Sequence, residues 1–252
     1  MTQSTLKLLA MLFMLCDHFA KVVLSTDVLQ TFLGIEGNEQ LIIALETVGR
    51  IAFPMFAWFV AEGCRKTHNF PKYLGRMAIF AVLSEVPFQY CFYAAGKNGL
   101  TLGGHNVMFT MLLAAVGIDG AKRLKAHGVS KVVSGYIPCI AVVLGWALQT
   151  DYNGWGVALI LMLYYLPEKK HKLILLACWM TVFMLFWHGW DGSTFRWLHA
   201  GGTSLLLMWL GGMFSVPILA TYNGQRGRRI KWLFYVFYPV HLAVLYGIRC
   251  LI

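Results

Sequence analysis

The stretch at residues 41–66 decides the fold, and it reads LIIALETVGRIAFPMFAWFVAEGCRK. Its first part, residues 41–63, is an apolar run long enough to cross a bilayer, because a transmembrane helix needs about 20 such residues. The run holds Arg50 near its middle, and the basic pair Arg65 and Lys66 follows it. An apolar run with a basic end and one interior charge is typical of a helix in a membrane protein.

The composition of the whole chain agrees with this interpretation. Of its 252 residues, 58% are hydrophobic and only 13% are charged, and the mean hydropathy is +0.63. Because a soluble domain is about half apolar and a quarter charged, these values exclude an ordinary soluble globule, a disordered chain and a disulfide-stapled secreted domain. We therefore expect an all-α integral membrane protein surrounded by the lipid bilayer and formed by a single domain over residues 1–252.

Apolar runs recur along the chain and predict a polytopic bundle of about nine transmembrane helices. They cover residues 5–24, 41–63, 73–95, 105–120, 132–150, 155–167, 172–188, 197–220 and 231–251. The runs at 105–120 and 155–167 are short for a bilayer, and the second could be re-entrant or tilted. We expect Pro54 to kink the second helix, and Gly211-Gly212 with Pro217 to kink or break the run at 197–220.

Basic residues indicate the side of the membrane on which each connection lies. Lys and Arg collect in alternate connections, at Arg65, Lys66, Lys72, Arg76, Lys122, Arg123, Lys125, Lys131, Lys169, Lys170, Lys172, Arg226, Arg228, Arg229 and Lys231. The other connections and the carboxyl end hold Lys21, Lys97, Arg196 and Arg249. Since cytoplasmic loops carry the excess of Lys and Arg, we expect a cytoplasmic N-terminus. The net charge of +10 then reflects the basic residues of the cytoplasmic connections, and no nucleic-acid partner is expected.

The cysteines and the amino end add two negative expectations. The 6 cysteines include no Cys-x-x-Cys pair, so we expect neither a metal site nor a disulfide framework. Residues 8–16 imitate a secretion signal, but no small-x-small cleavage site follows them. We therefore expect an uncleaved first helix.

Ionisable residues inside the apolar runs are the candidates for function, because a charge at mid-bilayer is costly and usually faces a cavity or a partner. Depths counted at about 1.5 Å per residue place the following residues in the middle or outer half of the membrane: Asp17, His18, Arg50, Glu85 and His241. Asn106 begins the fourth helix on the outer side. Such residues fit a structural ion-pair network, a proton path or a catalytic site.

The neighbours Asp17 and His18 favour catalysis, because a carboxylate beside an imidazole suits a general base near neutral pH. Adjacent residues on a helix point about 100° apart, however, so Asp17 could pair with Arg50 in place of His18. Lys7 lies on the same face of the first helix as His18, about 16 Å nearer the cytoplasm. A long carrier such as coenzyme A fits that span, with phosphates on Lys7 and its reactive end beside His18.

Short strings along the chain resemble one family, the TraX-type proteins, which are conjugal pilin N-acetylases. The strings lie, in order, at residues 6–7 (LK), 14–18 (MLCDH), 49–56 (GRIAFPMF), 62–63 (EG), 72–74 (KYL) with Arg76, 84–88 (SEVPF), 106–107 (NV) with 109–110 (FT), 151–156 (DYNGWG), 222–224 (YNG) with 226–227 (RG), and 237–242 (FYPVHL). They run through essentially the whole chain. More distantly, His18 and the Phe53-Pro54 step are similar to the heparan glucosaminide N-acetyltransferase and acyltransferase-3 families, which move acyl groups from cytosolic carriers to acceptors outside.

The resemblance implies a multi-pass acyltransferase of the bacterial cytoplasmic (inner) membrane. It would move an acetyl group from cytosolic acetyl-CoA to an amine acceptor such as a pilin N-terminus, a peptide or an amino sugar. His18, or Asp17 in its place, would take a proton from the acceptor, and Arg50 would orient Asp17 or stabilise the oxyanion. The other residues of the polar site would be Glu85, Asn106 and His241.

The carrier-binding residues implied by the resemblance are cytoplasmic and mostly basic. They are Lys7, Lys72, Tyr73, Arg76, Arg226 and Arg228. For Arg226 and Arg228, the excess of basic residues in cytoplasmic loops explains their presence equally well.

Two other classes of function stay open. One is a proton-coupled small-molecule transporter with Asp17, Glu85 and His241 as a relay, although the segment pattern holds no inverted repeat. The other is a non-catalytic pilus or envelope assembly factor whose polar groups lock its helices together. Transfer of label from acetyl-CoA that depends on His18 would distinguish an acyltransferase from the transporter and from the assembly factor.

Overall fold

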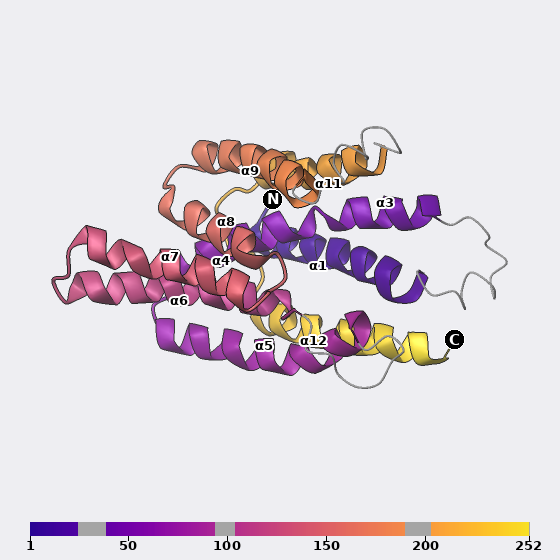
Figure 1. Cartoon of the computed structure of the whole chain (residues 1–252), viewed down its shortest axis with the longest axis horizontal. Helices are drawn as coiled ribbons and strands as arrows, with labels where there is room; N and C mark the ends of the chain where they lie inside the picture. Colours follow the sequence, from indigo (N-terminus) through magenta and orange to yellow (C-terminus); the bar gives the residue numbers. More distant parts are fainter. Residues whose placement is uncertain (25–38, 94–103, 190–202, 252) are drawn as a thin grey trace. The chain divides into compact units, whose positions relative to one another are not determined.

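The computed structural model describes residues 1–24, 39–93, 104–189 and 203–251. Within these ranges the chain is helical and holds no strand, apart from one bridge between His105 and Thr150, so the all-α class is confirmed (Figure 1). The helices are α1 (Gln3–Phe19), the π-helical turn η1 (Ala20–Leu24), α3 (Glu39–Gly49), α4 (Ala52–Lys66), α5 (Phe70–Phe92), α6 (Val107–Ala126), α7 (Lys131–Ala147), α8 (Asn153–Tyr165), α9 (Lys169–Gly189), α11 (Thr203–Ala220) and α12 (Lys231–Leu251).

The helices group into two compact units. The first unit consists of Met1–Phe56, Glu168–Phe234 and Ala243–Ile252, and the second consists of Ala57–Pro167 and Tyr235–Leu242. The boundaries fall inside α4 and α12, so these helices contribute residues to both units. The single transmembrane acyltransferase domain expected over residues 1–252 stays a prediction.

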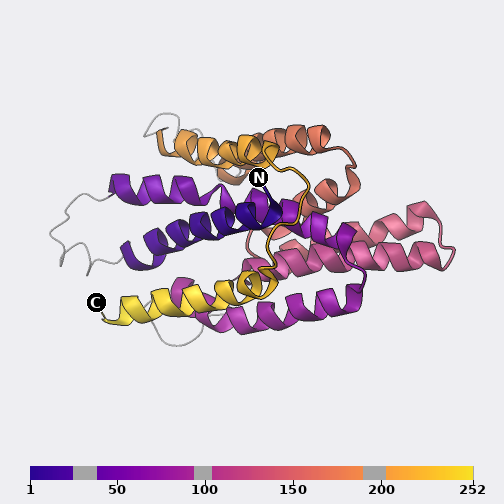
Figure 2. The same ribbon diagram turned by 180° about the vertical axis from the view of Figure 1, so that it is seen from behind.

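In the first unit, α3 lies between α1 and α11, and α9 packs against α11, as Figures 1 and 2 show from opposite sides. Glycines allow α3 to approach both neighbours closely. A Cβ atom on Gly49 would overlap the side chain of Asp17, and one on Gly211 would overlap the carbonyl group of Thr47. The close approach at Gly49 brings the polar side chain of Asp17 against the end of α3.

The helix predicted over residues 41–63 is interrupted next to the Phe53-Pro54 step, where a kink was expected. α3 ends at Gly49 and α4 begins at Ala52, so Arg50 lies in the break. Pro54 has no N–H, and the carbonyl of Arg50, four residues earlier, therefore loses its helical hydrogen bond. Within α4 the proline falls in the first turn, where an N–H group has no intrahelical partner. The break places Arg50 at a turn between two helices.

The run at 197–220, which was expected to be kinked or broken, is not broken in the part that the structure describes. α11 continues as one helix through Gly211-Gly212 and Pro217. Gly211 serves packing against Thr47, and neighbouring helices make a proline tolerable inside a helix. α5 and α12 also continue through Pro87 and Pro239.

In the second unit, α6 and α7 form a hairpin, α8 packs against both, and α5 lies along α6. Asn106 begins α6 as predicted, because its side chain accepts a hydrogen bond of 2.9 Å from the N–H of Met108. Arg65 donates to the carbonyl oxygens of Leu163 and Tyr164 at the end of α8, each over 3.0 Å. The last carbonyls of a helix need such donors, so Arg65 has a structural role in addition to the cytoplasmic position predicted for it.

Two stretches of the described chain, Gln40–Lys66 and Trp232–Leu251, are long and apolar enough to cross a membrane by length and composition alone. α8 is shorter, and at 1.5 Å per residue it spans about 20 Å, less than the hydrocarbon core of about 30 Å. The bundle of about nine transmembrane helices with a cytoplasmic N-terminus is not confirmed and stays a prediction. The outer connections expected at 25–40 and 97–104 fall almost wholly outside the described residues.

Candidate functional site

Asp17 is the centre of a charged cluster in the first unit. Its Oδ2 atom lies 2.7 Å from Nζ of Lys21, one turn along the helix. Its Oδ1 atom lies 3.7 Å from Nη2 of Arg50, and the Asp17 side chain is 13% exposed. Asp17 therefore pairs with Arg50, the alternative that the sequence left open. Two cations thus contact the single carboxylate of Asp17 where α1 meets the end of α3.

His18 follows Asp17 on α1 and is half-buried. Directly beyond Phe19, the chain passes into the π-helical turn η1, where the N–H of Ala20 meets the carbonyl oxygens of Cys16 and Asp17. π-Helical turns are rare, and they occur frequently at functional sites. The half-buried imidazole therefore lies where the helix changes its geometry.

The opposite end of α1 carries the predicted carrier-binding residues of the first unit, which are Lys7, Arg226 and Arg228. Nζ of Lys7 lies 4.4 Å from the ring centre of Phe234. The N–H of Ser4 donates to the carbonyl oxygen of Arg226 over 3.1 Å, and its Oγ accepts from the N–H of Arg228 over 3.1 Å. These bonds attach the connection between α11 and α12 to the first turn of α1. The side chains of Arg226 and Arg228 are exposed.

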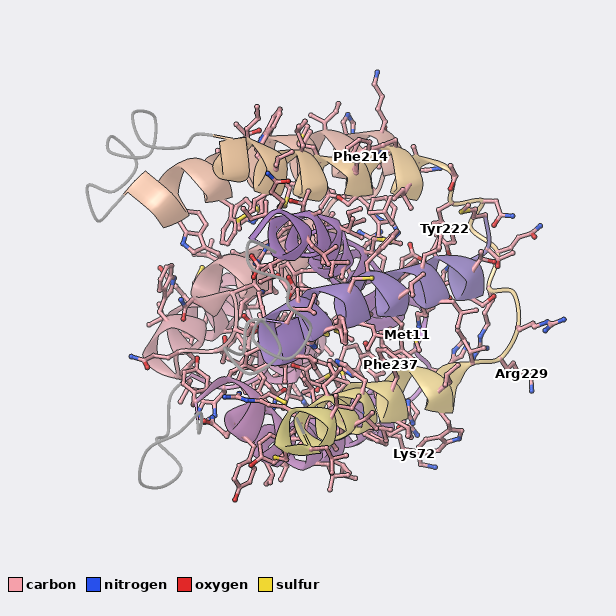
Figure 3. The ribbon with its side chains drawn as sticks, turned by 90° about the vertical axis from the view of Figure 1, so that its right-hand side faces the viewer. Met11, Lys72, Phe214, Tyr222, Arg229 and Phe237 are labelled. Carbon is pink, nitrogen blue, oxygen red and sulfur yellow. The ribbon has the colours of Figure 1, made fainter. Side chains whose placement is uncertain are left out.

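The other predicted carrier-binding residues lie near the start of α5, in the second unit. Lys72 is exposed (Figure 3). The hydroxyl of Tyr73 is hydrogen-bonded to the thiol of Cys64, and Arg76 is hydrogen-bonded to the hydroxyl of Tyr235. Tyr73 and Arg76 therefore take part in helix packing. The predicted carrier-binding residues fall into two groups, one in each unit.

Glu85 on α5 is the centre of a second polar cluster, in the second unit. Its Oε1 atom accepts from Nε2 of Gln89 over 2.7 Å and lies 3.0 Å from Nδ1 of His105. Its Oε2 atom accepts from Nδ2 of Asn106 over 2.6 Å and from the N–H of Asn106 over 3.2 Å. Both carboxylate oxygens are held, and two predicted site residues, Glu85 and Asn106, are in direct contact.

Sequence reasoning missed His105. The run predicted at 105–120 begins with this residue, but His105 precedes the helix that Asn106 caps, so helical spacing could not give its partner. The signal that could have found it is its place beside Asn106. Two further contacts join strings that carry the family resemblance: Thr110 Oγ1 donates to the carbonyl oxygen of Asp151, and the hydroxyl of Tyr238 bonds to the backbone of Val107.

His241 lies on α12 and is buried in the second unit. Its Nδ1 atom is 2.8 Å from the carbonyl oxygen of Phe237, one turn earlier, and its ring is stacked on the Phe237 ring with 4.6 Å between the ring centres. These contacts suit a packing role, and a catalytic role for His241 stays a prediction. Among the residues that the structure describes, no three His, Cys, Asp or Glu side chains gather as a metal ion would require.

Comparisons with known proteins place this arrangement in context. A family model described as TraX protein matches residues 2–249. A protein of Dichelobacter nodosus named probable fimbrial assembly protein FimC, serogroup H1, is 28% identical over 254 residues, which cover 95% of this chain and 92% of that protein. No solved structure matches. The family match spans both polar clusters and both groups of predicted carrier-binding residues.

Proposed function

Because the chain belongs to the TraX family, we propose that it is a membrane-embedded acyltransferase with a role in pilus assembly. It moves an acetyl group from cytosolic acetyl-CoA to an amine acceptor such as a pilin N-terminus. The relation of the TraX family to pilin acetylation supports the reaction. The relative named for fimbrial assembly supports the role in pilus assembly.

The observation that carries this proposal is the continuity of α1. The helix runs unbroken from Gln3 to Phe19, with Lys7 towards one end and His18 at the other. The two residues are separated by about 16 Å along the axis and by about three full turns, so they share one face. A carrier with phosphates at one end and a thioester at the end of a thin arm fits this separation.

The basic end of α1 supplies the phosphate site in this proposal. Lys7 is close enough to Arg226 for their charges to interact, and backbone bonds fix Arg226 and Arg228 to Ser4. Cations held together in this way repel one another until an anion binds among them. Arginine also binds phosphate through two parallel hydrogen bonds. CoA phosphates therefore suit this end of the helix.

The other end of α1 supplies the chemistry. His18 takes a proton from the acceptor nitrogen as that nitrogen attacks the thioester carbonyl carbon. The C–N bond forms, the C–S bond breaks, and the proton passes to the departing CoA thiolate. Arg50, held by Asp17, stabilises the negative charge that develops on the carbonyl oxygen.

Exposed apolar faces support a location in the membrane. Large apolar side chains lie exposed at spacings of three and four residues: Ile79, Val82, Leu83 and Val86 on α5; Val132, Val133, Tyr136, Ile140 and Val143 on α7; Leu233, Val236, Val240 and Val244 on α12. In water such continuous rows would be costly, because apolar surface is stabilised by about 25 cal/mol per Å² when it is buried. We propose that these faces contact lipid.

The test uses membranes that contain the full chain, radiolabelled acetyl-CoA and a peptide with a pilin-like N-terminal amine. Wild-type protein and the exposed-histidine control His127→Gln are expected to transfer label, and His18→Gln is expected to lose about 100-fold or more of the rate. Transfer by His18→Gln at the wild-type rate would contradict the assigned base. No transfer by the wild-type protein would contradict the proposed acetyltransferase activity and favour a transporter or an assembly factor.

A further inference from the structure

The connection between α11 and α12, residues 222–230, is fixed to the first turn of α1 within the first unit. We call this connection the basic loop. The N–H of Gln3 donates to the carbonyl oxygen of Gln225 over 2.8 Å. The N–H of Ser4 donates to that of Arg226 over 3.1 Å. A helix start leaves such N–H groups without an intrahelical partner. Here the basic loop occupies them, so an anion at this end of α1 has to be held by side chains.

The beginning of the basic loop is held in one conformation. Oδ1 of Asn223 accepts from the N–H of Gln225 over 3.0 Å. Nζ of Lys169, on α9, donates to the carbonyl oxygen of Tyr222 over 2.7 Å. Gly224 has a φ angle of 78°, which glycine adopts without a steric penalty. The YNG string of the family resemblance is therefore a turn that leads the chain out of α11 in a defined direction.

Gly227 lies against the first turn of α1. Its φ angle is 69°, and a Cβ atom there would overlap the hydroxyl groups of Ser4 and Thr2. These two hydroxyls lie 3.0 Å apart, and Oγ of the buried Ser4 accepts from the N–H of Arg228 over 3.1 Å. Glycine meets both requirements of the position, which are the left-handed backbone and the lack of space. The contact between Gly227 and Ser4 therefore fixes the backbone that carries the arginines.

Three arginines project from this fixed backbone. Arg226, Arg228 and Arg229 are exposed, and within the part of the chain that the structure describes no hydrogen bond or ion pair holds their guanidinium groups. Cations at such short spacing repel one another. An arginine binds phosphate through two parallel hydrogen bonds. A ligand with several phosphate groups therefore suits the basic loop better than a ligand with one.

We propose that the basic loop recognises the nucleotide part of the acyl carrier, with Arg226, Arg228 and Arg229 on its pyrophosphate and ribose phosphate. Ser4 and Gly227 are positioning residues, because they act through the loop. The inference rests on the proposed function, and it defines the carrier class as nucleotide thioesters. A phosphopantetheine arm on a carrier protein bears a single phosphodiester and would leave most of the arginine charge unbound. The basic loop and all of α1 belong to the first unit.

The experiment measures transfer of a labelled acetyl group by the purified full chain to a peptide with a pilin-like N-terminal amine. The donors are acetyl-CoA, acetyl-phosphopantetheine, which keeps one phosphate, and acetyl-pantetheine, which has none. With the wild-type protein, kcat/KM for acetyl-CoA is expected to exceed that for either other donor by about 10-fold or more, because charge-assisted hydrogen bonds to the missing phosphates are lost. The difference is expected in KM, since the reacting thioester is the same in every donor.

Gly227→Ala tests the positioning of the arginines without removing a charge. The added Cβ atom displaces the basic loop from Ser4, so KM for acetyl-CoA is expected to rise by about 10-fold with kcat near the wild-type value. For acetyl-pantetheine kcat/KM is expected to stay unchanged. Gly224→Ala is the matched control: its φ angle of 78° gives a similar backbone strain, but no heavy atom lies within 4 Å of the added Cβ atom. It is expected to keep the wild-type preference among the donors.

Ser4→Ala removes the hydroxyl that binds the N–H of Arg228 and is expected to give a smaller rise of KM for acetyl-CoA alone. If Gly227→Ala does not fold, Ser4→Ala decides, and a wild-type ratio of the donors there overturns the inference.

Equal kcat/KM of the wild-type protein for acetyl-CoA and acetyl-pantetheine would overturn the inference, while acetyl transfer itself would stand. Equal losses of Gly227→Ala with both donors would make its contact with Ser4 purely structural, and no loss with either would remove the contact from carrier recognition. Both results overturn the inference. A wild-type protein that transfers label from no donor overturns the proposed function and the inference together.

Discussion

Asp17 on α1 and Arg50 in the break between α3 and α4 form an ion pair with 3.7 Å between Oδ1 and Nη2. The same carboxylate binds Lys21 over 2.7 Å. Asp17 therefore keeps one cation when Arg50 is removed, whereas Arg50 connects α1 to the end of α3. The ion pair between the helices and the pair within α1 can be tested separately.

Arg50→Ala is expected to lower both acetyl transfer and stability in detergent. Loss of a partly buried charged contact costs about 1–2 kcal/mol, which corresponds to a melting temperature lower by roughly 2–8 °C. Thermal melts of the purified protein check this. The control is Lys66→Ala, which removes a pair with Glu62 in which Lys66 is 55% exposed, and such pairs contribute less than about 1 kcal/mol. A wild-type melting temperature for Arg50→Ala would contradict the structural role of the pair.

Gly49→Ala is expected to separate α1 from α3 and to reduce stability and transfer together. The added Cβ atom would overlap the side chain of Asp17, which cannot move without disturbing its two ion pairs. Gly75→Ala on α5 is the matched control, since no heavy atom lies within 4 Å of the added Cβ atom. Alanine is favoured over glycine in a helix by about 1 kcal/mol, so this control is expected to be as stable as the wild type or more so. Equal stability of the Gly49→Ala and Gly75→Ala proteins would argue against the close contact.

CoA binding is expected to weaken with salt and with the loss of basic residues at the start of α1. Lys7→Gln and Arg228→Gln remove charges that phosphates would contact, and added salt screens such contacts. Calorimetric titration with CoA measures both effects. Lys125→Gln removes an exposed charge of α6 and is the control for net charge alone. His18→Gln is expected to bind CoA normally. If His18→Gln lost CoA binding while Lys7→Gln kept it, the assignment of the phosphates to Lys7 and of the thioester to His18 would have to be reversed.

The predicted topology can be tested by labelling single cysteines in intact cells. Asn69→Cys lies in a connection predicted to be cytoplasmic, and Gln40→Cys lies at the predicted outer end of the second apolar run. A reagent that does not cross the membrane is expected to label position 40 and not position 69. Labelling of both positions from outside would mean that the chain does not cross the membrane between them.

Much of the helix pattern could be predicted from the sequence, because long apolar runs bounded by charge leave few alternatives. The interruption at Arg50 followed from a local rule, since a proline inside a continuous helix would leave the carbonyl of the residue four positions earlier without its hydrogen bond. A break was one of the two outcomes expected within α11, and it is absent for a non-local reason. Gly211 is needed for contact with Thr47, and that contact depends on a helix distant in the sequence.

The candidate site was less predictable, because its contacts join segments that helical spacing cannot relate. His105 lies outside any helix, and its partner Glu85 precedes it across a connection between α5 and α6. Arg65 was counted as a topology charge, but the ends of two helices meet at its side chain. In both cases the partner is a group whose position depends on tertiary packing.

The central claim is acetyl transfer from acetyl-CoA to a pilus subunit amine, and the most direct measurement is the intact mass of that subunit. Pilus subunits are prepared from cells with the wild-type protein, with His18→Gln and without the gene. The account predicts the mass of one added acetyl group on the N-terminal peptide in wild-type cells, and its absence in the other two. The same subunit mass in all three cell lines, with no metabolite acetylated in its place, would contradict the account.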